Sequence, residues 1–285
     1  MEGSSLLQAI VSSLFLASFY VLVASGLALQ FSILRVINFV HGQFYMLASF
    51  VTFFIFSSLG LNYFIALIAA MVVMALLGLI LERFYYRIMG IQEMPAVIGA
   101  MGIAMIIERI MSIQMGNFPK PVPDVFDVIW RFGGAVLTGQ RLLVIITAIV
   151  IMGSLMLFIW KTKIGKAMRA VSQDAEAASA QGINVNFIRL LAMGIGCAMA
   201  GAAGALMAPI SQAFVYGGLE PMLKGFIIII IGGLGSLGGA VIGGAILGLV
   251  DGFGIQFIGY PAHILGFVIV VVVLILKPQG ILGRE

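Results

Sequence analysis

Charged residues are scarce in this sequence. Asp, Glu, Lys and Arg make up 9% of its 285 residues, whereas 62% are hydrophobic and the mean hydropathy is +1.20. A soluble domain usually carries about 25% charged residues, so this composition does not provide a water-exposed surface. The apolar residues instead form repeated runs of about 20, the length that crosses a bilayer as a helix. The sequence therefore predicts an all-α integral membrane protein and excludes a single soluble core.

Groups that usually carry chemistry are also few. Cys197 is the only cysteine, and the two histidines, His41 and His263, are far apart in the chain. An intrachain disulfide is therefore excluded, and a clustered metal site is not expected. The sequence contains no G-x-x-x-x-G-K-[ST] loop for ATP, no H-E-x-x-H and no G-x-S-x-G. We expect no enzyme active site, no cofactor and no metal in this chain.

Hydropathy, together with the Gly, Pro and charged breaks between apolar runs, predicts about eight transmembrane helices in a single domain, 1–285. They lie near residues 6–29, 40–58, 62–81, 92–111, 142–160, 187–208, 222–257 as a broken pair, and 262–276.

The basic residues lie in the loops between these segments, which indicates a topology signal rather than a nucleic-acid surface. When the broken pair at 222–257 is counted as two crossings, one side holds Arg35, Arg83, Arg87, Lys161, Lys163, Lys166, Arg169, Arg189, Lys277 and Arg284, and the other holds Arg109, Lys120, Arg131, Arg141 and Lys224. Cytoplasmic loops are enriched in Lys and Arg, so the first group is predicted to be cytoplasmic. The N-terminus is then outside and the C-terminus is cytoplasmic.

Two loops are unusually long. The external loop, 116–140, contains three prolines and is expected to form extended or turn structure and short interfacial helices. The cytoplasmic loop, 161–186, is Ala-rich and predicts one amphipathic helix from Lys166 to Gln181 that ends at Gly182. Such a helix lies on the lipid interface, on the protein's own helix ends or on a partner. Its composition alone leaves these three open.

Within this loop, residues 176–182 have the form E-A-A-x-x-x-G, which resembles the coupling loop of permeases of bacterial ABC importers. The general signature continues with I-x-L-P, which this chain lacks. Blocks at 36–47, 162–170, 224–226 and 231–240 extend the resemblance along nearly the whole chain. They are similar to the LivH-type branched-chain amino-acid permeases, the inner-membrane components of binding-protein-dependent transport systems.

The resemblance implies a multi-pass protein of the bacterial cytoplasmic membrane that moves branched-chain or related amino acids by alternating access. Its partners would be a second permease subunit, identical or different, two cytoplasmic ATP-binding subunits, an external solute-binding protein and the lipid bilayer, with no nucleic acid. Arg169, Asp174 and Glu176 would make polar contacts to the ATPase, and Ala177 and Ala178 would pack into its cleft. The implied coupling residues are Gly165, Arg169, Asp174, Glu176, Ala177, Ala178 and Gly182.

Polar groups and irregular backbone inside spans are costly, so each is a candidate for the translocation pathway. Their alternatives are helix capping or an interfacial position for the first three, a plain hairpin for the glycine turn, and contact with a neighbouring helix for the aspartate. The candidates are Asn38, His41, Gln43, Gly233, Gly235, Ser236 and Asp251.

Glycines have two further patterns. Residues 233–238 fit G-x-G-x-x-G, but the flanks are membrane helices rather than a βαβ unit, so a dinucleotide site is rejected. Gly244, Gly248 and Gly252 repeat every four residues, which is typical of close helix packing, either within the subunit or between subunits.

An alternative function is an ion-coupled secondary transporter or a passive channel for small solutes. It would need ionisable groups inside the membrane, for which Asp251 and Glu108 are the candidates, although Glu108 and Arg109 favour a structural role near a helix end. The sequence does not identify the transported solute.

Overall fold

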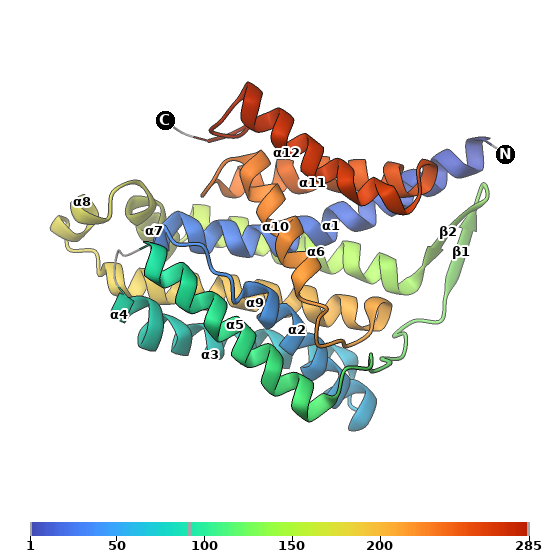
Figure 1. Cartoon of the computed structure of the whole chain (residues 1–285), viewed down its shortest axis with the longest axis horizontal. Helices are drawn as coiled ribbons and strands as arrows, with labels where there is room; N and C mark the ends of the chain where they lie inside the picture. The colour runs from blue at the N-terminus through green and yellow to red at the C-terminus, as the bar shows by residue number, and fades with distance from the viewer. Residues whose placement is uncertain (1, 90–92, 284–285) are drawn as a thin grey trace.

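The computed structural model describes residues 2–89 and 93–283, and these residues fold as a bundle of helices with one small hairpin (Figure 1). The elements are α1 (Glu2–Leu34), α2 (His41–Thr52) continued by a π-helical turn (Phe53–Ser58), α3 (Tyr63–Leu81) continued through a second π-helical turn (Glu82–Tyr86) into α4 (Arg87–Met89), α5 (Glu93–Met115), β1 (Ile129–Phe132), β2 (Ala135–Thr138), α6 (Gly139–Lys161), α7 (Lys163–Gln173), α8 (Ala175–Ala180), α9 (Val185–Ser211), α10 (Leu219–Gly232), α11 (Leu237–Phe257), a 3-10 turn (Tyr260–Ile264) and α12 (Leu265–Leu276).

Six helices of the described chain are long and apolar enough to cross a membrane. The six are α1, α3 together with its continuation through α4, α5, α6, α9 and α11. The prediction of about eight spans differs partly because two apolar segments form shorter helices: α10 has 14 residues and α12 has 12. These two helices rise only about 21 and 18 Å at 1.5 Å per residue, less than the hydrocarbon core of about 30 Å. The helix made of α2 and its π-helical continuation has the polar residues His41 and Gln43 in its first turn and is not among the six.

The long loop after α5 contains an antiparallel hairpin instead of the expected short helices. Residues Ile129–Phe132 pair with Ala135–Thr138 across a turn of two glycines with positive φ, Gly133 and Gly134. Residue Lys120, upstream in the same loop, pairs with Ala213 after α9. The hairpin and the helices α7 and α8 lie at opposite ends of the bundle (Figure 1).

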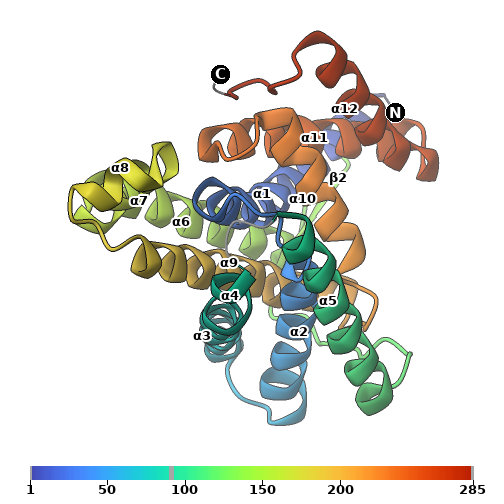
Figure 2. The ribbon, with the colours of Figure 1, turned by 60° about the vertical axis from the view of Figure 1, so that its left-hand side comes forward.

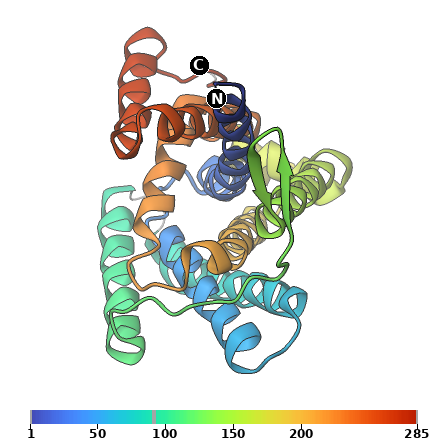
Figure 3. The same ribbon diagram turned by 90° about the vertical axis from the view of Figure 1, so that its right-hand side faces the viewer.

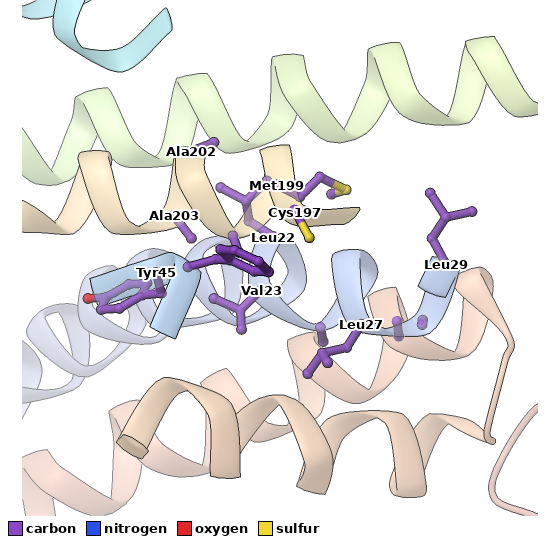
Figure 4. Close-up of a cluster of buried hydrophobic side chains, with 14 of the residues drawn as sticks. Leu22, Val23, Leu27, Leu29, Tyr45, Cys197, Met199, Ala202 and Ala203 are labelled. Carbon is purple, nitrogen blue, oxygen red and sulfur yellow. The ribbon is translucent and has the colours of Figure 1, made fainter. Parts of the chain in front are cut away.

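Helix α9 is the centre of the bundle. Within its most apolar window 78% of residues are buried, against 28–44% in the other five spans, so α9 is covered by protein on almost all sides. Its contact face is built from Ala and Gly, which lets neighbouring backbones approach closely. Ala203 of α9 faces larger side chains of α1 and Tyr45 of α2, whereas Ala202 points to the opposite side of α9 (Figure 4).

Helices α1 and α11 pack through the predicted glycine repeat. A Cβ atom at Gly244 would meet Val21, one at Gly248 would meet Ala17, and one at Gly252 would meet Ser13. Successive glycines of α11 thus face residues four apart on α1. The repeat therefore serves packing within this subunit, which decides between the two alternatives left by the sequence.

The same arrangement occurs twice, in opposite directions. Each copy consists of a long helix, an irregular segment, a short helix and a second long helix. The first copy is α1–α2–α3 and the second is α9–α10–α11. Helix α1 packs on α11 as α9 packs on α3, where Gly201 approaches Met74 and Gly78 approaches Cys197. Helices α1 and α9 run antiparallel (Figure 1). The fold is therefore an inverted repeat, an arrangement that many transporters use.

Candidate functional site

The two short helices, α2 and α10, begin next to each other in the middle of the bundle. His41, the first residue of α2, lies with its ring Nε2 3.2 Å from the carbonyl oxygen of Val23, which is near the midpoint of α1. A Cβ atom on Gly42 would lie 2.5 Å from the carbonyl oxygen of Gly218, the N-cap of α10, and one on Gly218 would clash with the carbonyl of Gly42. We call this contact the glycine junction.

Asn38 fixes the irregular segment that leads to α2. Its Oδ1 accepts hydrogen bonds from the amide of Val40 at 3.0 Å and from the hydroxyl of Tyr86 at 3.1 Å, and its Nδ2 donates to Gln30 Oε1 at 3.1 Å. Asn38 and His41 are both buried inside this chain. Asn38 therefore orders the segment before α2 without capping the helix, whose N-cap is Val40, and the buried side chains of Asn38 and His41 lie behind the glycine junction.

Gln43 has a different environment. Its Nε2 donates to Glu108 Oε2 on α5 at 3.3 Å, whereas its Oε1 is buried and has no hydrogen-bond partner within residues 2–89 and 93–283. Glu220 lies in the first turn of α10, two residues after Gly218, and is exposed. Two carboxylates thus belong to the surroundings of the glycine junction, on α5 and α10, which line one side of the bundle with α2 (Figure 3).

This group of residues suits a small zwitterion. The N-terminal ends of α2 and α10 carry partial positive charge from their helix dipoles, which stabilises an anionic group such as a carboxylate. Glu108 and Glu220 supply negative charge for a cationic group such as an ammonium. Sequence analysis did not single out Glu220; the available signal was an acidic residue directly after Gly217 and Gly218 at the start of an apolar run.

Asp251 is buried against neighbouring helices. Its Oδ2 lies 2.6 Å from Lys224 Nζ on α10 and 2.6 Å from the hydroxyl of Tyr20 on α1. Lys224 is 4% exposed and Asp251 is not exposed. The assignment of Lys224 to an external loop was therefore wrong, because its charge is neutralised inside the bundle. For Asp251 the structure shows the alternative of a contact with a neighbouring helix.

The glycine turn at 233–236 lies far from the glycine junction. Gly233 and Gly235 have φ of 102° and 79°, and Ser236 caps α11 by accepting a hydrogen bond from the amide of Gly239 at 3.0 Å. The C-terminal segment pairs with this turn, with the amide of Leu282 2.9 Å from the carbonyl oxygen of Gly232. The turn joins α10 to α11 as a plain hairpin, at the end of the bundle that also holds α7.

The predicted amphipathic helix is in fact two helices, α7 and α8. They break at Asp174, whose backbone is extended at φ −151° and ψ 108°. Its Oδ1 accepts hydrogen bonds from the amides of Glu176 and Ala177, both at 2.9 Å. Ala-rich periodicity concealed this break because Asp174 is an N-cap residue rather than a Pro or Gly. Gly182, with φ of 82°, ends α8 as predicted.

The predicted coupling residues face in different directions. Ala178 is buried against its own chain, so it does not pack into a partner. Arg169 donates from Nη1 to the carbonyl oxygen of Ile159 at 2.6 Å and covers the ring of Trp160, and a Cβ on Gly165 would clash with Ile159. Arg169 and Gly165 thus hold α7 against the end of α6. Glu176 and Ala177 are exposed at the break.

Asp174→Ala is expected to loosen α8. Loss of an N-cap that satisfies two amides costs about 1 kcal/mol, and a helix of six residues has little other local stabilisation. Hydrogen exchange should show faster exchange at Glu176 and Ala177 in the variant, with α7 unchanged. Asp174→Asn keeps a capping side chain and is the matched control. Equal protection in Asp174→Ala and the native chain would contradict the capping role.

Comparisons with known proteins agree over almost the whole chain. The family described as "Branched-chain amino acid transport system / permease component" matches residues 9–276. The high-affinity branched-chain amino acid transport system permease protein LivH of Escherichia coli K12 is 31% identical, over 98% of this chain and 96% of its own length. BraD of Pseudomonas aeruginosa, described in the same words, is 30% identical over the same shares.

A more distant relative is the probable branched-chain amino acid transport permease protein LivH of Methanocaldococcus jannaschii, 27% identical over 93% of this chain and 89% of its own length. No solved structure matches the chain. The expected resemblance is confirmed, and the apolar spans agree with a multi-pass membrane protein. The chain belongs to the family of permease components of branched-chain amino acid transport systems.

Proposed function

We propose that this chain is the membrane-spanning subunit of an ATP-driven importer for branched-chain or related amino acids in a bacterial cytoplasmic membrane. The observation that carries the proposal is the match to permease components along 98% of the chain. With the α7–α8 end in the cytoplasm, the N-terminus is outside and the C-terminus is cytoplasmic. A second permease subunit, two ATPases and an external binding protein complete the importer.

The coupling surface is the exposed break between α7 and α8. The two helices project beyond the ends of the spans (Figure 2). Asp174, Glu176 and Ala177 are exposed there, and they fit a docking role better than Ala178 and Arg169, which face their own chain. We call this exposed break, with Asp174, Glu176 and Ala177, the α7–α8 corner, and closure of the ATPases would move it. The α7–α8 corner is joined to α6 through Thr162, whose hydroxyl accepts a hydrogen bond from the amide of Gly165 at 3.0 Å.

The pathway passes the glycine junction on the side of α2, α5 and α10. Gln43, Glu108 and Glu220 would contact the amino acid there, with Asn38 and His41 holding the junction behind them. Glu220 is exposed at the start of α10, and burying its charge in lipid would cost free energy. This side of the bundle therefore suits contact with a second permease subunit, with a water-filled pathway between the two subunits. Alternating access would then tilt one repeat against the other around the junction.

The alternative of an ion-coupled transporter or passive channel is less well supported. Asp251, its main candidate, is already neutralised by Lys224 and Tyr20. Relatives described as components of transport systems also favour a multi-subunit machine.

Ala177→Glu tests the proposal. The importer is reconstituted in lipid with its ATPases and binding protein, and ATP hydrolysis is measured with and without leucine. Ala177 is exposed, so the added carboxylate leaves the fold intact, but it blocks an apolar contact with the ATPase. We expect loaded binding protein to stimulate hydrolysis in the native complex and not in the variant. Val136→Glu adds the same charge on the exposed face of β2 at the opposite end and should behave as native.

The two levels of the proposal fail separately. Equal stimulation in Ala177→Glu and the native complex would remove the α7–α8 corner as the docking site. Absence of stimulation in the native complex with every branched-chain amino acid would instead argue against the importer assignment.

A further inference from the structure

A cavity of about 650 Å³ lies between the ends of α1 and α6, the helix α7 and the glycine turn before α11. Arg35 and Arg169 line it, and among the described residues its lining includes no Asp or Glu. Ser32 and Ser236 add hydroxyl groups. A recess with two guanidinium groups and no carboxylate among its lining residues favours an anion.

Both arginines are held in place by one backbone contact each. Arg35 leaves α1 in a left-handed conformation, with φ of 57°, and its Nη2 donates to the carbonyl oxygen of Ser172 at 2.6 Å. Arg169 Nη1 donates to Ile159 O at the same distance. A guanidinium has five N–H donors, so each side chain has further donors beyond that bond. The two contacts position the charges at the cavity.

The N-terminus of α11 adds a third positive element. Leu237 and Gly238, the first two residues of this 21-residue helix, line the cavity. The first amides of a helix have no intrahelical acceptor, and the Ser236 side chain accepts from Gly239, one position further on. The amides of Leu237 and Gly238 therefore lie at the cavity, at the positive end of the helix dipole.

A second, apolar cavity of about 350 Å³ lies between α1, α6 and α11 and is lined by Val21, Met152, Gly153 and Val241 among others. Met156 lines both cavities. From Val21 to Ser32, α1 rises about 16 Å. Trp160, 62% exposed, lies beside the basic cavity at the end of α6, where Trp favours the membrane interface.

We propose that the two cavities, which meet at Met156, together bind one anionic phospholipid. Its phosphate lies between Arg35, Arg169 and the start of α11, and one acyl chain follows α1 and α6 past Gly153. The apolar cavity favours a lipid over a soluble phosphate, because a soluble anion would use only the basic cavity. Since Arg169 belongs to α7, the lipid also links the α7–α8 segment to the spans; this consequence rests on the proposed function, whereas the binding does not.

The test measures lipid retention by native mass spectrometry. The chain is incorporated in nanodiscs of equal parts phosphatidylglycerol and phosphatidylethanolamine and then released into detergent. Each arginine near an anionic lipid contributes about a fivefold preference, so roughly 25-fold enrichment of phosphatidylglycerol is expected. Arg35→Gln and Arg169→Gln should each lower the enrichment about fivefold. Arg131→Gln, an exposed arginine of β1, should leave it unchanged.

Gly153→Phe tests the acyl chain without changing charge. No atom lies within 4 Å of a Cβ at Gly153, so the ring enters the apolar cavity without moving the backbone. Gly102→Phe on α5, where space is equally open, is the matched control. We expect Gly153→Phe to lose phosphatidylglycerol and Gly102→Phe to retain it. Equal retention in both, equal retention of the two lipids by the native chain, or displacement of the bound anion by inorganic phosphate would each overturn the proposal.

Discussion

Asp251→Asn is expected to lower the free energy of unfolding of the purified chain by about 3–5 kcal/mol. The substitution removes the negative charge that lies 2.6 Å from Lys224 Nζ, and it leaves that ammonium buried between α10, α11 and α1. Breaking one side of a buried ion pair is costly because the remaining charge has neither water nor a counter-charge. Unfolding in detergent, followed by intrinsic fluorescence against temperature, measures the loss.

Removing both charges separates the ion pair from other causes. Lys224→Met with Asp251→Leu replaces the pair by apolar side chains, which is often neutral or stabilising, so the double variant should regain most of the loss. Tyr20→Phe deletes only one hydrogen bond to Asp251 and should cost about 1.5–3 kcal/mol. A double variant less stable than Asp251→Asn would show that the two residues do not act as a pair.

Gly218→Val is expected to stop transport while leaving the chain in the membrane. A Cβ atom at this position clashes with the backbone carbonyl of Gly42, and neither partner has a flexible side chain that can move aside. The ends of α2 and α10 must therefore separate, which displaces Gln43 and Glu220 from the glycine junction. Overpacking against backbone costs about 1–3 kcal/mol, so a bundle of this size should survive. Leucine uptake by reconstituted vesicles is the measurement.

The control for this variant is Gly102→Val on α5. Its Cβ meets no atom within 4 Å, so uptake should remain native and any general cost of a branched residue in a helix is accounted for. Uptake by Gly218→Val at the native rate would show that the glycine junction is not part of the moving pathway. A loss of uptake in both variants would point to helix propensity rather than to the junction.

Hydropathy located the helices because helices that contact lipid consist of long runs of apolar residues. Helices at 63–81 and 139–161 agree closely with predicted segments. Hydropathy could not show that α2 and α10 begin inside the bundle, since apolar runs look alike whether they start at the surface or at mid-depth. A weak signal existed: residues 39–42 read Phe-Val-His-Gly and residues 214–217 read Phe-Val-Tyr-Gly. The similarity of these two short sequences becomes evident only when the fold brings the starts of α2 and α10 together at the glycine junction.

The candidate site was partly accessible. Asn38, His41 and Gln43 were selected because polar groups inside spans need a reason. Their pairing with Glu108 and Gly218 was not predicted, because these two residues are distant in sequence and only the fold brings them together. The prediction for Ala178 failed in the direction that its side chain faces. Ala178 lies in the predicted coupling segment, but which alanines of α8 face inward depends on the break at Asp174.

The pair of Lys224 and Asp251 also constrains how the protein is made. Helix α10 emerges from the ribosome first, with an ammonium in an apolar run of only 14 residues, and Asp251 follows 27 positions later. Inserting either helix alone places an uncompensated charge in the hydrocarbon, at a cost of about 2.5–3.5 kcal/mol on insertion scales. Insertion of α10 and α11 together, as a hairpin in which Lys224 and Asp251 are already paired, avoids this cost. We therefore expect the glycine turn to form before the two helices leave the translocon.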